Sequence, residues 1–182
     1  MAFDAGPPRD CQACPRLAEF RAANRAEHPE WSNAPVESFG GAGAGLLIVG
    51  LASGSYERRA DDGLRLVDCA IANAVRCVPP QNKPTPQEMA SCRPYLERAI
   101  AALPRLKAIV ALGRIAHEST LRALGLRLAA YPFAHGARHA LPGGSPALFD
   151  SYHCSRYNTN TGVLTPDMFR EVLRAARDFL KN

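Results

Sequence analysis

The segment Gly45-Leu46-Leu47-Ile48-Val49-Gly50-Leu51-Ala52 is a continuous apolar run of strand length that ends in small residues. An apolar run without alternation is typical of a strand buried on both faces of a parallel sheet. The run Lys107-Ala108-Ile109-Val110-Ala111-Leu112-Gly113 has the same character, so we predict a second buried strand there. Weaker strand patterns cover residues 67–75 and 148–154.

Helix signals lie between and after these strands. Thr85 is followed by Pro86 and then by Glu88, which is a capping-box pattern with proline at the first helical position. We therefore predict a helix over residues 86–102, and similar signals predict helices over 17–25, 114–124 and 166–180. Strands that alternate with helices predict an α/β fold with helices on both faces of the sheet.

Length and composition set broad limits on the protein. A chain of 182 residues, 47% of them hydrophobic, predicts one domain spanning residues 1–182. The net charge of +5 permits a nucleic-acid partner without establishing one. No apolar run approaches the roughly 18 residues of a membrane span, and the first residues lack the apolar core of a signal peptide. We therefore predict a cytoplasmic protein without a membrane partner.

Four cysteines have the spacing of a metal site. Cys11 and Cys14 form a C-x-x-C pair, and Cys77 and Cys92 are two further thiols that the fold has to bring to it. Four thiolates suit zinc or an iron–sulfur cluster, and the spacing alone does not choose between them. The alternative is that all four are ordinary buried thiols. Cys69 and Cys154 are interpreted as core thiols.

Candidate ligand-binding residues follow the predicted strands, because ligands of open α/β sheets bind beyond the carboxyl ends of the strands. The polar run from Tyr152 to Gly162 contains a single imidazole, that of His153. His153 is either a half-buried polar residue or a functional one, and the adjoining polar residues favour function. Asn82 and Asn158 are either turn formers or amides that bind a nucleobase edge.

The other histidines carry weaker signals. His28 and His117 have polar or helical surroundings and are interpreted as structural or solvated. His135 and His139 flank Arg138 in a loop rich in glycine and proline. We predict that both are solvated, with contact to phosphate as the alternative.

Five motifs in order along nearly the whole chain resemble the type-5 (B-type) uracil-DNA glycosylases. They are Cys11-x2-Cys14-Pro15-Arg16-Leu17, Gly50-Leu51-Ala52, the run from Ala74 to Pro86, the run from Ala111 to Ala116, and the run from Tyr152 to Thr165. The resemblance implies a three-layer α/β/α sandwich around a central four-stranded parallel sheet. It also implies removal of uracil and other deaminated bases from DNA, and a [4Fe-4S] cluster held by Cys11, Cys14, Cys77 and Cys92.

The resemblance also implies roles for individual residues. The catalytic residues are His153 and Asn82, and the pocket for the flipped base is lined by Gly50, Leu51, Ala52, Asn73 and Asn158. The expected DNA contacts are Lys83, Arg114, Ser155 and Arg156, with residues 155–162 forming a wedge that holds the duplex open. The expected partner is damaged DNA, double-stranded or single-stranded, and the expected state is a monomer.

The sequence departs from the family pattern after Ala52. In the family, the Gly-Leu-Ala motif leads into a proline, a loop containing glycine and histidine, an aromatic that stacks on the base, and an acidic residue that orients water. Here Ala52 continues directly into Ser53-Gly54-Ser55-Tyr56. The alternative function is therefore a cluster-containing DNA-binding protein of the same fold with impaired catalysis. A redox sensor is a third, weaker hypothesis.

Overall fold

The computed structural model describes residues 6–52, 65–144 and 146–181, which contain a six-stranded sheet of order β1-β3-β2-β4-β6-β5. The four inner strands are parallel and consist of β3 (Cys69–Asn73), β2 (Leu46–Gly50), β4 (Ala108–Leu112) and β6 (Ala147–Ser151). The predicted four-stranded parallel sheet is confirmed. Two short strands, β1 (Phe39–Gly40) and β5 (Arg138–His139), extend its edges in antiparallel orientation.

Five helices accompany the sheet within the described residues. They are α1 (Pro15–Glu27), α2 (Pro86–Ala101), α3 (Arg114–Ala123), α4 (Arg156–Asn160) and α5 (Pro166–Leu180), with short 3-10 turns at Pro80–Asn82 and Leu128–Ala130. None of the helices in the described part of the chain is long and apolar enough to cross a bilayer.

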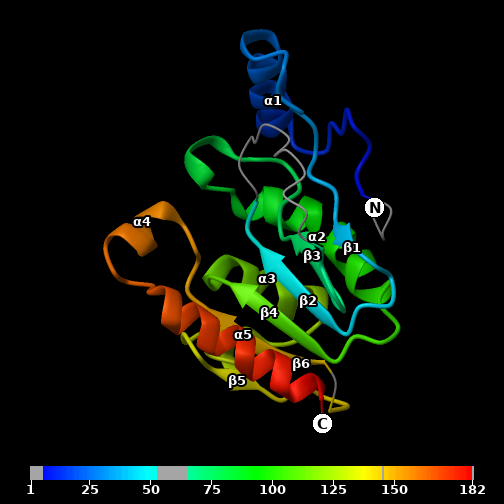
Figure 1. The fold of residues 1–182 in the computed structure, drawn as a ribbon. Helices are drawn as coiled ribbons and strands as arrows, with labels where there is room; N and C mark the ends of the chain where they lie inside the picture. Colours follow the sequence, from blue (N-terminus) through cyan, green and yellow to red (C-terminus); the bar gives the residue numbers. More distant parts are fainter. Residues whose placement is uncertain (1–5, 53–64, 145, 182) are drawn as a thin grey trace.

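The inner strands bury side chains on both faces. Leu47 and Val49 of β2 pack in one core cluster with residues of α2 and α3, whereas Leu46 packs in a second cluster with Val172 and Ala176 of α5. Figure 1 shows α5 on one face of the sheet and α2 and α3 on the other. The three-layer α/β/α arrangement is therefore confirmed, and it explains why the inner strands read as continuous apolar runs.

Two local features differ from the sequence expectations. The predicted wedge at residues 155–162 contains a short helix, α4, whose N-cap is Ser155. The last inner strand ends at Ser151 and not at Cys154, so His153 lies in the loop that follows β6. The capping box of α2 is present as predicted, since Thr85 and Glu88 each accept a bond from the other's backbone N–H.

Candidate active site and cysteine group

Because the inner strands are parallel, their carboxyl ends meet at one end of the sheet, on the side where α4 lies in Figure 1. Gly50 at the end of β2 pairs in register with Asn73 at the end of β3. A Cβ atom at residue 50 would lie 2.8 Å from the Asn73 side-chain oxygen Oδ1. Glycine at this position therefore makes room for the buried amide of Asn73, and Leu51 and Ala52 follow directly as half-buried loop residues.

His153 is held closely at the same end of the sheet. Gly113, which follows β4, has a φ of +93°, and a Cβ there would lie 3.1 Å from the Cβ of His153. Glycine permits both the positive φ and this close approach. The carbonyl oxygen of His153 accepts a hydrogen bond of 2.8 Å from Nδ2 of Asn158. The structure thus brings His153, Gly113 and Asn158 together.

Burial lowers the pKa of the His153 imidazole, because a charged ring loses hydration in this half-buried position. The uncharged ring is therefore favoured at neutral pH. A neutral imidazole still carries one N–H donor and one acceptor nitrogen. His153 is thus suited to donate a hydrogen bond to a group that becomes negative, without bringing a full charge of its own.

We expect His153 to titrate with a midpoint below the ordinary histidine value of 6.5. Because the folded-state pKa is lowered, the unfolded chain binds this proton more readily than the folded chain does. Protonation of His153 therefore lowers the free energy of unfolding as the pH falls below 6.5. Proton–carbon NMR of the histidine rings from pH 5 to pH 8 measures the midpoint, and His153→Gln assigns the signal. A midpoint at or above 6.5 contradicts the expectation.

The predicted DNA contacts Lys83, Arg114 and Arg156 are all exposed. The Arg114 guanidinium, at the start of α3, lies 5.4 Å above the centre of the Phe133 ring. Asn82 is also exposed and has a φ of +57°, in the 3-10 turn that precedes α2. The roles of these residues in DNA binding and catalysis stay predictions.

Two other predicted site residues support the backbone around His153. Ser155 caps α4 by accepting the Asn158 N–H at 3.3 Å. Asn158 uses its side chain to hold the His153 carbonyl. The geometry gives both residues a local structural contact, and a place for Asn158 in a base pocket stays a prediction.

The four predicted metal ligands lie before and at the start of α1 (Cys11 and Cys14), in the loop after β3 (Cys77) and within α2 (Cys92). Cys14 is the N-cap of α1, and it packs with Cys77 and Cys92 around Leu17. Burial, together with the nearby Cys77, Cys14 and Cys11, raises the pKa of the Cys92 thiol to about 11. All four cysteines are free thiols, and their role as metal ligands stays a prediction.

Hydrogen-bond donors point at two of these sulfurs. Nη1 of Arg21 lies 3.0 Å from Sγ of Cys77, and its Nη2 donates to the Cys11 carbonyl at 2.7 Å. The backbone N–H of Arg76 lies 3.5 Å from Sγ of Cys92. Such donors favour a sulfur that carries negative charge, as a metal-bound thiolate does.

Within the described residues, His117, His139 and Asp150 offer three possible ligand atoms that all lie within 4.8 Å of one another. The kind of metal group that the four cysteines would hold stays a prediction.

An ion pair ties together the helices that carry Cys14 and Cys92. Arg16 in the first turn of α1 donates to both carboxylate oxygens of Glu88 in the first turn of α2, at 2.8 and 2.7 Å. Its Nη2 also donates to the Lys83 carbonyl at 3.1 Å. This bidentate bond is the main cause of the lowered pKa of Glu88.

We expect Glu88→Gln to lower the free energy of unfolding by about 1 kcal/mol at pH 7. Glutamine keeps the capping bond to Thr85 but loses the charge that faces Arg16. Because the folded pKa of Glu88 is lowered, its stabilisation is present above the ordinary value and is lost as the pH falls through the lowered one. Urea unfolding at several pH values measures the difference. Asp167→Asn, at the exposed start of α5, is the control. A difference that does not shrink in acid contradicts the expectation.

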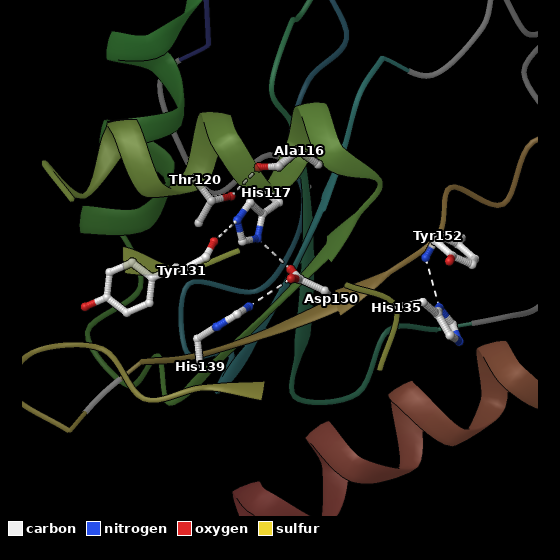
Figure 2. A network of polar contacts seen from close by, with 8 residues as sticks. All are labelled: Ala116, His117, Thr120, Tyr131, His135, His139, Asp150 and Tyr152. Carbon is white, nitrogen blue, oxygen red and sulfur yellow. Dashed lines mark hydrogen bonds and ion pairs between the residues drawn. The ribbon is translucent and has the colours of Figure 1, made fainter. Parts of the chain in front are cut away.

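A buried hydrogen-bond network lies beside the carboxyl end of β6 (Figure 2). Nδ1 of His117 lies 2.7 Å from one carboxylate oxygen of Asp150, and Nε2 of His139 lies 2.9 Å from the other. Nε2 of His117 donates to the Tyr131 carbonyl at 2.8 Å. His117 therefore uses both ring nitrogens in hydrogen bonds, and the set is closed as a network without a metal ion.

This network corrects one interpretation from the sequence and adds a residue that it missed. The side chain of His139 is 11% exposed and bonds Asp150, so its interpretation as a solvated or phosphate-contacting loop residue is wrong. His117 is structural, as one of the two interpretations held. Asp150 was overlooked, although a carboxylate inside a buried strand needs polar partners.

Comparison with known proteins gives consistent matches. A family model described as the uracil DNA glycosylase superfamily matches residues 37–177. A type-5 uracil-DNA glycosylase of Thermus thermophilus is 40% identical, with 92% of this chain and 92% of its own length covered. A type-5 uracil-DNA glycosylase of Pyrobaculum aerophilum is 31% identical, with 92% of this chain and 88% of its own length covered. A type-4 uracil-DNA glycosylase of Saccharolobus solfataricus is 28% identical over 92% and 82%.

The length of the first match bears on the departure after Ala52. It extends over 205 aligned positions, which exceeds the 182 residues of this chain. The Thermus protein therefore has internal residues without a counterpart here. The segment that directly follows Ala52 lies outside the described residues.

Proposed function

The chain belongs to the uracil DNA glycosylase superfamily, and from this premise we propose that it is a DNA repair enzyme that hydrolyses the N-glycosidic bond of uracil in DNA. Other deaminated bases are further substrates in this proposal. The observation that carries it is the match along 92% of the chain, together with an uncharged His153 held at the carboxyl end of the sheet. An enzyme that repairs chromosomal DNA would act at the nucleoid, which agrees with the cytoplasmic location that the sequence predicts.

Substrate binding requires the base to leave the duplex stack. In our proposal the flipped uracil enters the end of the sheet between Gly50 and His153, with Asn73 beside Gly50. The Asn73 amide offers both a donor and an acceptor, which is what the edge of uracil requires. Exposed Lys83, Arg114 and Arg156 contact phosphates and hold the strand.

The chemical step breaks the bond between the sugar carbon C1′ and the base nitrogen, whose electron pair stays with the base. As this bond breaks, the sugar develops positive character and the departing base becomes negative. Water then adds to C1′ and releases a proton to the solvent or to the departed base. His153 donates a hydrogen bond to this negative base. Its uncharged state suits that role, because the donor is in place without a change in protonation.

The cysteine group fits a [4Fe-4S] cluster in this proposal. Cys11, Cys14, Cys77 and Cys92 would hold it, since each binds a different iron and four-cysteine ligation is usual for such clusters. When bound, the cluster cross-links the N-terminal segment to α2 and adds a redox-active group. The chain's own contribution is to gather the thiols and to aim Arg21 at Cys77.

The experiment that tests the function measures release of uracil from an end-labelled duplex by this 182-residue chain. The control duplex carries thymine at the same position. A second protein carries the additional residues of the Thermus relative after Ala52. Excision by both proteins supports the enzyme and shows that another group positions water, whereas excision by the longer protein alone shows that the added residues are needed. Binding to the duplex without excision by either protein favours the alternative of a non-catalytic DNA-binding protein.

A further inference from the structure

The segment from Tyr131 to His139 is anchored on both sides of His135. On one side, the Tyr131 carbonyl accepts from His117, and on the other, the His139 ring bonds the Asp150 carboxylate. Asp150 is fully buried. These hydrogen bonds fix the segment against α3 and β6. His135 therefore lies in a stretch of backbone that is anchored on both sides (Figure 2).

The antiparallel pairing between β5 and β6 continues beyond both strands. The Asp150 N–H donates to the Ala137 carbonyl, and the Gly136 N–H donates to the Asp150 carbonyl, both at 2.9 Å. The next donor on this edge is the Tyr152 N–H, and its acceptor is Nδ1 of the His135 side chain at 3.0 Å. The last bond at this edge is thus made to an imidazole and not to a backbone carbonyl.

His135 also contacts the Tyr152 side chain. The two rings stack with centroids 4.8 Å apart and an angle of 24° between their planes. Phe133 lies on the same side, 6.3 Å from the Tyr152 ring, and carries the Arg114 guanidinium over its face. The groups that face His135 are therefore an aromatic ring, a phenol and, across Phe133, a cation. Among the described residues no carboxylate forms an ion pair with His135.

An imidazole nitrogen differs from a carbonyl as an acceptor. Nδ1 of His135 accepts the Tyr152 N–H only while it carries no proton. Once protonated, it is a donor that faces another donor, and the bond is lost. The attachment at this edge therefore depends on the His135 side chain offering an acceptor nitrogen, whereas a backbone carbonyl is always an acceptor.

The attached residue is the immediate neighbour of His153. Gly113 packs against the His153 Cβ on the β4 side, and Asn158 holds the His153 carbonyl from α4. The bond between Tyr152 and His135 supplies the attachment on the outer edge of β6. Without that bond, the backbone at His153 keeps only its contacts with Gly113 and Asn158.

We propose that His135 is a positioning residue for His153: its Nδ1 accepts the Tyr152 N–H, fixes the backbone that leads into His153, and thereby places the catalytic imidazole. This proposal rests on the proposed function, in which His153 contacts the departing base. Small displacements of a catalytic group lower rates strongly, even when the substituted residue lies outside the pocket.

Two variants and a control separate positioning from general structural support. His135→Ala removes the acceptor, whereas His135→Asn places an amide oxygen near the position of Nδ1 that cannot be protonated. His28→Ala is the control, because His28 stacks on Trp31 at the end of α1, and α1 lies far from β5 in Figure 1. The measurements are the single-turnover rate of uracil excision from pH 5 to pH 8, the affinity for the duplex, and hydrogen exchange of the Tyr152 amide.

We expect His135→Ala to lower the excision rate at pH 8 by about tenfold with duplex affinity unchanged. His135→Asn should keep the rate within about threefold of the wild type, because its amide oxygen can accept the Tyr152 N–H. The Tyr152 amide should exchange slowly in the wild type and in His135→Asn, and quickly in His135→Ala.

An unchanged rate in His135→Ala overturns the proposal, and so does an equal loss in the alanine and asparagine variants. Failure of the proposed function looks different, because then the wild type itself excises no uracil. In that case amide exchange still decides whether His135 holds Tyr152. Equal exchange of this amide in all variants overturns the positioning role regardless of activity.

Discussion

His153→Ala lowers the single-turnover rate of uracil excision by about 10²–10³-fold, which is the usual effect of removing one hydrogen-bond donor from a developing negative charge. The structure supports an effect of this size, because burial keeps the ring uncharged and Gly113 and Asn158 hold it in place. The affinity for an undamaged duplex should change little, since His153 acts on the base only after it is flipped. Rapid-quench measurement of base release with enzyme in excess gives the rate directly.

The control for this prediction is a histidine away from the site. His28→Ala removes an imidazole of similar exposure that stacks on Trp31. It should leave the excision rate within about twofold of the wild type. If His153→Ala excises uracil at a rate within threefold of the wild type, His153 does not stabilise the departing base, and another donor at the carboxyl end of the sheet takes that role.

The inner strands could be predicted from the sequence because each is a short apolar run without alternation. Leu46–Gly50 and Ala108–Leu112 are covered by helices on both faces, so nearly every position is buried and the pattern is continuous. The edge strands could not be predicted in this way. Phe39–Gly40 and Arg138–His139 have two residues each, which is too short for any pattern, and they form because an inner strand offers free backbone groups.

The surroundings of His153 were predicted in part. Its place at the end of the last inner strand follows from the strand pattern, but the end of that strand depends on contacts distant in sequence. The Gly113 N–H donates to the Ser151 carbonyl, 38 residues along the chain, at 2.7 Å. Such long-range bonds leave no periodic signal, so the predicted strand ran on to Cys154.

The histidines show a similar limit. The glycine and proline content of their loop predicted that His135 and His139 are solvated. In the structure, this loop runs back along β6. The one available signal was Asp150, a carboxylate within an otherwise apolar strand. Since an unpaired buried carboxylate is strongly unfavourable, its presence predicts polar partners, and the histidines of the preceding loop were the candidates.

The second large effect is expected at the cysteine group. Cys77→Ser should reduce the iron content of the purified protein to near background and remove its brown colour, because the proposed cluster loses a buried ligand. The variant also leaves the buried Arg21 guanidinium facing a hydroxyl in place of a sulfur. We expect a loss of at least about 3 kcal/mol in the free energy of unfolding, and thus a fall in Tm of about 6–12 °C.

Two cysteines outside the group provide matched controls. Cys69 lies on β3, where burial raises the pKa of its thiol to about 11, and Cys154 is exposed in the loop after His153. Cys69→Ser and Cys154→Ser should keep the iron content of the wild type, even if Cys69→Ser lowers Tm through lost packing. Iron content separates ligation from stability, because a thiol that only packs can lower Tm without releasing metal. Full iron content in Cys77→Ser would show that Cys77 is not a ligand. Loss of iron in Cys69→Ser would instead make Cys69 a ligand, although both sequence and structure place it outside the cysteine group.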